Sequence, residues 1–108
     1  MYLLPKSLEI AEKAAAESMV LLKNEGSILP LENVGTIAVI GPVANDSTQL
    51  LGNWGARARA EDVVGIVQGM CEEYAGKSNI LIAKGCDFEG NDKSGFTEAV
   101  RVAKASDA

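Results

Sequence analysis

The chain has 108 residues, enough for one small domain or for part of a larger one. Its hydrophobic fraction of 47% is that of a globular chain rather than a disordered one. A net charge of −5 argues against nucleic acid or an anionic membrane as the partner, because both require a clustered basic surface. No apolar run approaches the roughly 20 residues that a helix needs to span a bilayer.

The first predicted element is a helix that follows Pro5, with Ser7 as its N-cap. Asn24-Glu25-Gly26 ends this helix, since Gly26 can adopt the left-handed conformation that helix ends often need. Pro30 keeps Leu29 out of helical space, so the stretch 28–31 is expected to be extended. The apolar residues at helical spacing, which we expect to be buried, are Leu8, Ala11, Ala15, Met19 and Leu22.

Two continuous aliphatic runs, Thr36–Ile40 and Asn79–Ala83, are typical of buried parallel strands. Gly41-Pro42 stops the first run, and a polar loop from Ala44 to Arg59 follows it. A second polar loop, 85–95, follows the other run. Long loops at the carboxyl ends of parallel strands are where such folds place ligands.

Two more helices complete the pattern. Glu61 and Asp62 are expected to open the first of them, because negative charge suits a helix N-terminus. The second is expected to begin near Ser94, and residues 105–108 resemble a turn that feeds a third strand. The predicted buried residues are Val63, Val67, Met70, Cys71 and Tyr74 in the first, and Phe96, Ala99, Val100 and Ala103 in the second.

The order of elements is therefore α-β-α-β-α, which predicts an α/β fold with a parallel sheet and right-handed crossovers. We expect an incomplete parallel-sheet α/β sandwich, similar to half of a flavodoxin-like fold, in which the next strand is missing. The pattern gives no reason to place a domain boundary within residues 1–108.

Several kinds of site are not expected. The chain has no histidine and only two cysteines, Cys71 and Cys86, which excludes the usual zinc signatures and any Ser-His or Cys-His pair within it. A Cys71–Cys86 disulfide stays open, although a buried, unpaired Cys71 is favoured. The carboxylates of the loop 87–92 lack the order of a calcium loop, and Gly41-Pro42 lacks G-x-G-x-x-G. We therefore predict neither a metal site nor a cofactor.

The loop around Trp54 is the strongest internal indication of a site. Trp54 is the only tryptophan, it lies between two glycines, and Arg57 and Arg59 are close in sequence. One interpretation is that Trp54 stacks on a flat ligand face such as a sugar ring, while the arginines donate hydrogen bonds to hydroxyls or hold a carboxylate. The other is that Trp54 folds back onto Leu50-Leu51.

A series of motifs resembles the start of the second domain of family 3 glycoside hydrolases, the β-glucosidase group. The resemblance extends from about Ile10 to Ala108. Its motifs are Leu21-Leu22-Lys23-Asn24, Leu29-Pro30-Leu31, Ile37 to Pro42, Gly52-Asn53-Trp54 and Ala83-Lys84-Gly85-Cys86.

The resemblance implies a place in a larger enzyme. Such enzymes pair a barrel-like first domain, which carries an aspartate nucleophile, with a second α/β sandwich domain. Their acid/base is usually a glutamate on a loop of the second domain, beyond the strand that would follow Ala108. The resemblance thus implies that residues 1–108 are a fragment of the second domain of a retaining β-glucosidase-like hydrolase. No residue of the chain inherits a catalytic role, and we expect the isolated chain to be inactive.

The resemblance also implies that the loop 52–59 approaches the sugar cleft, with Trp54, Arg57 and Arg59 as substrate-binding residues on the aglycone side. The partners would be a carbohydrate, the missing barrel domain and the rest of the sandwich domain. The compartment stays open, although family members are often secreted or periplasmic. Two alternatives remain: a flavodoxin-like module that binds a small ligand, and a non-catalytic interaction fragment that pairs through an uncovered strand edge.

Overall fold

The computed structural model describes residues 4–108. The chain divides into two compact units, Met1–Leu31 and Glu32–Ala108. The expectation of one domain without an internal boundary stays a prediction.

The first unit contains helix α1, Pro5–Ser18. Pro5 occupies its first turn, where proline fits because that N–H needs no helical partner. The N-cap is Leu4, whose carbonyl accepts the Ser7 and Leu8 N–H groups at 2.8 and 3.1 Å, so the prediction of Ser7 as cap is wrong. The helix ends at Ser18, so Met19 and Leu22 of the predicted buried face lie outside it. None of the residues of α1 is buried, and the predicted buried face is therefore wrong.

The segment after α1 is held by one asparagine. The Asn24 side chain donates to the Leu29 carbonyl at 2.7 Å and accepts the Leu29 N–H at 3.0 Å. Between them lies a short 3₁₀ turn, η1, Glu25–Ser27, in which Gly26 has a left-handed φ of 71°. The Asn24 side chain therefore ties the end of the first motif, Leu21-Leu22-Lys23-Asn24, to the second, Leu29-Pro30-Leu31. Since α1 has already ended at Ser18, the prediction that Asn24-Glu25-Gly26 ends this helix is wrong.

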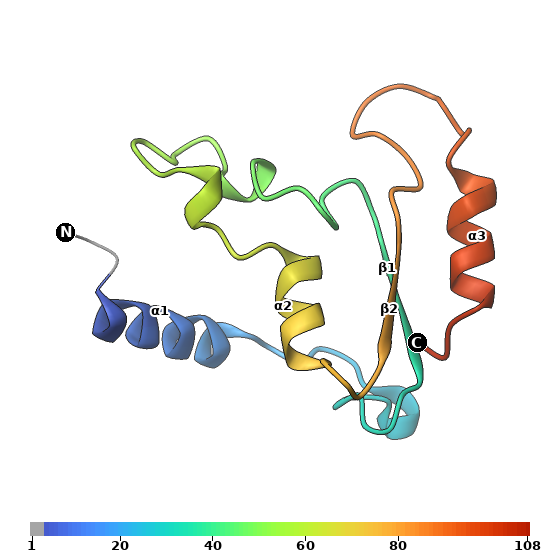
Figure 1. Ribbon diagram of the computed structural model, residues 1–108, viewed down its shortest axis with the longest axis horizontal. Helices are drawn as coiled ribbons and strands as arrows, with labels where there is room; N and C mark the ends of the chain where they lie inside the picture. Colours follow the sequence, from blue (N-terminus) through green and yellow to red (C-terminus); the bar gives the residue numbers. More distant parts are fainter. Residues whose placement is uncertain (1–3) are drawn as a thin grey trace. The chain divides into compact units, whose positions relative to one another are not determined.

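The second unit is built on two parallel strands, β1, Thr36–Ile40, and β2, Asn79–Ala83, whose bounds match the prediction. The register pairs Thr36 with Asn79 and Ile40 with Ala83. Helix α2, Ile66–Glu73, and helix α3, Phe96–Lys104, lie on opposite faces of this strand pair (Figure 1). The α-β-α-β-α order and the incomplete α/β sandwich are thus confirmed.

The core of the second unit is small and aliphatic. Five hydrophobic residues are buried among those described: Ile37, Ala44, Val67, Ala83 and Val102. Val102 of α3 is the most deeply buried at 2% exposure, whereas Phe96 and Val100 remain 46% and 51% exposed. The predicted stripe of α3 is therefore wrong in part: Ala99 is half-buried, but Ala103 is exposed as well, and the helix turns Val102 toward the core instead.

Helix α2 begins later than predicted. Its N-cap is Gly65, and residues 60–62 form a separate 3₁₀ turn, η3, Ala60–Asp62. Glu61 and Asp62 therefore do not open the helix. The Val67 N–H donates to the Ala44 carbonyl at 3.1 Å, which ties the start of α2 to the loop that follows β1.

Residues 105–108 form the predicted turn toward a third strand. The Ala38 N–H donates to the Ala108 carbonyl at 2.7 Å, on the edge of β1 opposite to β2. Within residues 4–108, no helix is long and apolar enough to cross a bilayer.

Candidate functional site at the carboxyl ends of the strands

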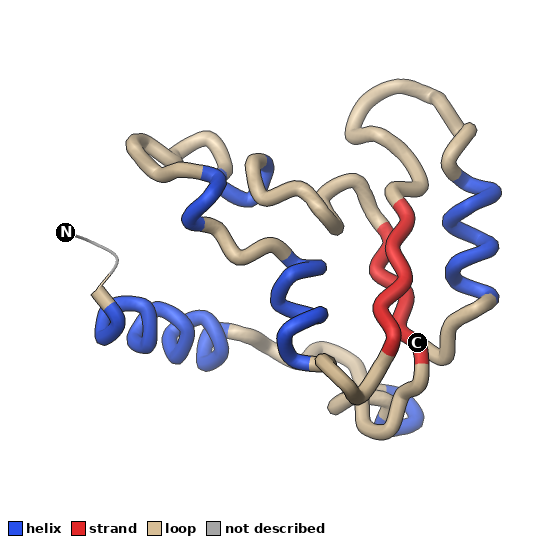
Figure 2. The backbone as a smooth tube through the Cα atoms, viewed as in Figure 1, coloured by secondary structure: helices blue, strands red, loops and turns tan. Residues whose placement is uncertain are grey.

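Two long loops leave the carboxyl ends of β1 and β2, as the sequence predicted (Figure 2). The first, 41–65, contains two short 3₁₀ turns, η2, Gln49–Leu51, and η3. The second, 84–95, contains no helix or strand. In parallel α/β folds this end of the sheet is where ligands bind.

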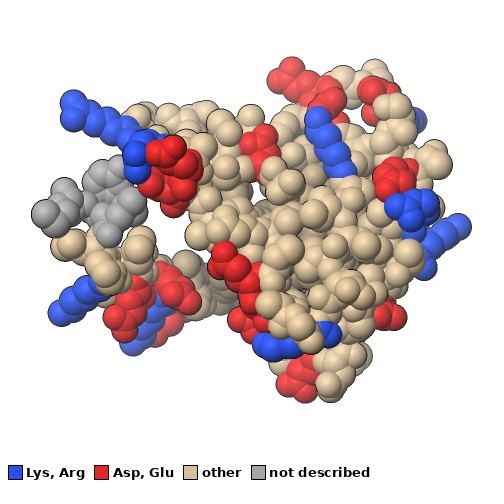
Figure 3. All heavy atoms as spheres, in the orientation of Figure 1, with Lys and Arg blue, Asp and Glu red and all other residues tan. Residues whose placement is uncertain are grey.

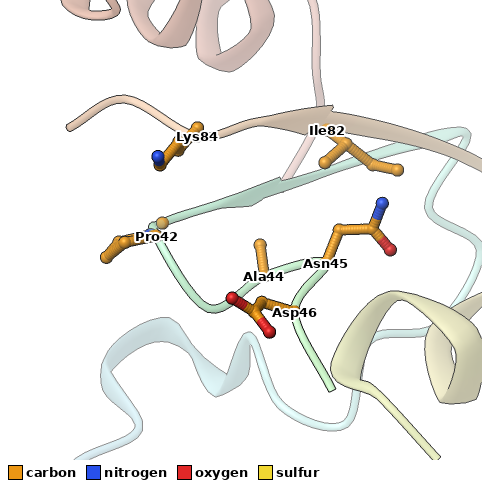
Figure 4. A pocket seen from close by; sticks show the side chains of 7 residues that line it. Pro42, Ala44, Asn45, Asp46, Ile82 and Lys84 are labelled. Atoms are coloured by element: carbon orange, nitrogen blue, oxygen red, sulfur yellow. The ribbon is translucent and has the colours of Figure 1, made fainter. Parts of the chain in front are cut away.

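A hollow of about 260 Å³ lies next to the carboxyl ends of β1 and β2. Asn45 and Asp46 line it from the first loop, and Ile82 and Lys84 line it from the chain of β2 (Figure 4). The sequence reasoning did not single out Asn45, Asp46 or Lys84 for this site. The signal was present, because polar residues follow closely after both predicted strands.

Lys84 is the cation of this hollow. It forms an ion pair and a hydrogen bond with Asp87. This hydrogen bond and the negative charge of Asp87, together with the charge of the more distant Asp46, raise the pKa of Lys84 above its ordinary 10.5. Asp46 also stabilises the loop, because its carboxylate accepts hydrogen bonds from the backbone N–H groups of Thr48 at 2.9 Å and Gln49 at 3.3 Å. The hollow is therefore lined by a charged amine and an amide, groups that bind hydroxyls.

Trp54 lies in the first loop and is 96% exposed. It therefore does not fold back onto Leu50-Leu51, and the interpretation that it stacks on a flat ligand face stays a prediction. Gly52, two residues earlier, has φ 63° and ψ −174°, a conformation that is essentially restricted to glycine. The backbone at Gly52 thus needs a glycine to present the tryptophan as it does.

Arg59 is held by carboxylates of its own loop. Its guanidinium donates twice to Asp62, with both N···O distances 2.8 Å, and its third nitrogen lies 2.7 Å from Glu61. The hydrogen bond from Arg59 lowers the pKa of Asp62 below its ordinary 3.8. Arg59 thus binds the neighbouring carboxylates, one of the two roles considered for the arginines. Arg57 is exposed. None of Trp54, Arg57 and Arg59 lines the 260 Å³ hollow.

The second loop is closed on itself. Asp92 accepts the Ser94 N–H and hydroxyl at 2.8 Å each, and these bonds lower its pKa below 3.8. Gly95 approaches the Gly85 carbonyl so closely that a side chain would collide with it. Among residues 4–108, no three histidine, cysteine or acidic side chains gather as metal ligands would.

The two cysteines are free and exposed. The expectation of a buried Cys71 is therefore wrong, and the structure contains no disulfide between Cys71 and Cys86. Cys71 lies one helical turn after Val67, the buried residue of α2, and on the same face, but it is exposed near the end of this short helix.

Acidic and basic side chains are interspersed over the face of the molecule shown in Figure 3. The exposed ion pairs of the second unit include Arg101 with Glu98 at 2.7 Å and Lys77 with Glu73 at 3.2 Å. A dispersed arrangement of this kind offers no basic tract for a phosphate backbone on that face.

Comparison with known proteins identifies relatives of the chain. Residues 19–108 match the model of the glycosyl hydrolase family 3 C-terminal domain. A Salmonella typhimurium protein named "Periplasmic beta-glucosidase" is 41% identical over 98 residues, which is 85% of this chain and 13% of that protein. An Aspergillus flavus protein named "Probable exo-1,4-beta-xylosidase bxlB" is 39% identical over 103 residues, 95% of this chain and 12% of the relative.

A "Beta-xylosidase" from Formosa agariphila is 35% identical over 108 residues, 94% of this chain and 14% of that protein. The chain thus spans about an eighth of the length of the relatives it matches. Of these three relatives, one is named a beta-glucosidase and two are named xylosidases.

Proposed function

The chain belongs to glycosyl hydrolase family 3, and on that premise we propose that it is part of a retaining β-glycoside hydrolase in which its Trp54 loop forms one wall of the sugar cleft. The substrates would be β-linked glucosides, β-xylosides or related oligosaccharides, the two classes that the relatives' names include. The sugar would meet the chain at the loop 52–59, with the barrel domain and the remainder of the sandwich domain as its partners in the enzyme.

The observation that carries the proposal is the exposure of Trp54. An indole that is 96% exposed leaves a large apolar face in water, which is costly unless a ligand or partner covers it. A pyranose ring fits such a face, because its axial C–H groups form an apolar surface while its hydroxyls point outward. The loop that carries Trp54 also leaves the carboxyl end of β1, where α/β folds bind ligands.

The arginines would act differently from each other. Arg59 is fixed by Asp62 and Glu61, so it would hold the shape of the loop. Arg57, exposed and three residues from Trp54, would donate hydrogen bonds to hydroxyls on the aglycone side.

Hydrolysis with retention requires two carboxyl groups about 5–5.5 Å apart, one as nucleophile and one as acid/base. We assign neither to this chain. Several of its carboxylates, those of Glu61, Asp87 and Glu98 among them, form ion pairs with arginine or lysine of their own loops and helices. The nucleophile would come from the barrel domain and the acid/base from a later loop of the sandwich domain. The chain alone would therefore be inactive.

A chimera tests this proposal. The segment of the Salmonella typhimurium protein that matches this chain is replaced by the corresponding segment of this chain. The chimera and the isolated chain are then assayed with a chromogenic aryl β-glucoside and a chromogenic aryl β-xyloside. We expect turnover by the chimera and none above background by the isolated chain. Turnover by the isolated chain would refute the assignment of catalysis to other parts of the enzyme. A folded but inactive chimera would refute the proposal that this segment serves a β-glycosidase.

A further inference from the structure

The hollow beside the carboxyl ends of β1 and β2 combines aliphatic surface with polar groups. The side chains that line it are those of Pro42, Ala44, Asn45, Asp46, Ile82 and Lys84. In Figure 4, Asn45 and Lys84 lie at opposite ends of the hollow: the Asn45 amide points toward Ile82, whereas Lys84 lies across from Pro42. Small-molecule sites have this composition, an apolar lining in which a few polar groups fix the orientation of the ligand.

The backbone that forms one wall of the hollow is anchored to two neighbouring elements. The Gly41 N–H donates to the Ala83 carbonyl of β2 at 3.0 Å, and the Ala44 carbonyl accepts the Val67 N–H of α2 at 3.1 Å. Ala44 and Val67 are both buried, at 4% and 7% exposure. The wall is therefore held in place before a ligand arrives, which reduces the ordering cost of binding.

The charges around the hollow disfavour an anionic ligand. Lys84 is the cation of the lining and is paired with Asp87, while Asp46 adds a second carboxylate. With two negative charges for this positive one, the hollow repels phosphate more than it attracts it. Neutral hydroxyl groups suit it better, because an ammonium group carries N–H donors and the Asn45 amide offers both a donor and an acceptor.

A pyranose ring matches the hollow in polarity and in size. Its C–H groups form an apolar surface that would cover Ile82, which is 41% exposed, while its hydroxyls would reach the amide and the ammonium groups. The volume of about 260 Å³ lies just below the roughly 300–1,000 Å³ of typical small-molecule sites, so it suits one ring rather than an oligosaccharide.

We propose that this hollow binds one neutral pyranose unit. Lys84 and Asn45 donate hydrogen bonds to its hydroxyls, and Ile82 packs against its C–H groups. The position differs from the one proposed at the Trp54 loop, since Trp54 and Arg57 do not line the hollow. The two proposals can therefore fail separately.

The test is an NMR titration of the isotope-labelled 108-residue chain with methyl β-glucopyranoside. The backbone amide signals of Ala44 and Asp46 report on the hollow, and the indole N–H signal of Trp54 reports on the Trp54 loop in the same spectra. Inorganic phosphate is titrated in parallel as an anionic probe. We expect saturable shifts of the two amide signals with the sugar, with a dissociation constant on the order of 1 mM for so small a ligand.

Two variants remove the hydrogen-bonding groups, and a third is their matched control. Lys84→Met should weaken binding about tenfold and Asn45→Ala about threefold, because a hydrogen bond from a charged donor is the stronger. Lys77→Met should leave binding unchanged. Lys77 also forms an ion pair, with Glu73, and its side chain is 65% exposed against 63% for Lys84, but it does not line the hollow.

Four results would overturn the proposal. They are the absence of saturable shifts at Ala44 and Asp46, equal weakening by Lys77→Met and Lys84→Met, and the same shifts produced by phosphate at lower concentration than by the sugar. The fourth is sugar-dependent shifts confined to the Trp54 indole, which would leave the proposal for the Trp54 loop intact.

Discussion

The two loops at the carboxyl ends of β1 and β2 start from neighbouring strands and are built in opposite ways. The loop 84–95 is closed at its base by the approach of Gly95 to Gly85 and by the Asp92–Ser94 hydrogen bonds. The loop 41–65 is fixed by ion pairs of Arg59 and presents an almost fully exposed Trp54. One loop is therefore closed on itself, while the other displays an exposed aromatic side chain of the kind that packs against a sugar ring.

The largest effect should follow from opening the closed loop. In Gly95→Ala, the new Cβ would lie 2.9 Å from the Gly85 carbonyl carbon and closer still to its oxygen, so the backbone must shift. The dihedral angles at Gly95, φ −78° and ψ −9°, suit alanine, which leaves the collision as the cause. We expect a loss of about 1–3 kcal/mol in the free energy of unfolding, measured by urea denaturation.

Gly69→Ala is the matched control. Gly69 lies inside α2, and a Cβ there would meet only the Val64 side chain at an ordinary 3.8 Å. Alanine is favoured over glycine in a helix, so this variant should be more stable by about 0.5–1 kcal/mol. If both variants changed stability equally, the close approach of Gly85 and Gly95 would not be what holds the loop.

A smaller effect is expected from the ion pairs of the open loop. Because the Arg59 hydrogen bond lowers the pKa of Asp62 below 3.8, the interaction is present above that pH and is lost as the pH falls through the lowered value. Trp54, as the only tryptophan, reports on the loop. Its fluorescence anisotropy should fall on acidification below about pH 3.8, the ordinary pKa of the carboxyl group.

Asp62→Asn provides the control for this titration. The variant should have a lower Trp54 anisotropy at neutral pH and should lose the acid-dependent step. Glu98 and Asp92, whose pKa values are also lowered, titrate at acid pH in both chains and so cannot account for a difference between them. An unchanged acid step in Asp62→Asn would show that another group holds the loop.

The strands could be predicted to the residue because each is a continuous aliphatic run with a sharp end. The helix boundaries could not be predicted in this way, because they depend on competing local interactions. Glu61 and Asp62 pair with Arg59 in a separate turn, and α2 begins only at Ile66. The buried face of α3 also depends on how it crosses a narrow two-stranded sheet, which helical periodicity does not specify.

The candidate site was predictable in part. Its location followed from loop length and strand order, and Trp54 followed from being a lone tryptophan between glycines. The exposure of Trp54 was undecided, because an indole beside an apolar pair can pack either way. Lys84 and Asn45 were missed, since single polar residues after a strand are common and only the fold brings the two loops to one hollow.

The central claim is that the Trp54 face binds sugar, and the most direct test is the kcat/KM of Trp54→Ala and Trp54→Phe in the β-glucosidase chimera. We expect Trp54→Ala to lower kcat/KM by about tenfold, equivalent to about 1.4 kcal/mol, with Trp54→Phe recovering much of it through its remaining ring. Phe88→Ala, which removes a 62% exposed aromatic ring from the closed loop, should leave kcat/KM unchanged. Equal kcat/KM for Trp54→Ala and the unsubstituted chimera would contradict the claim.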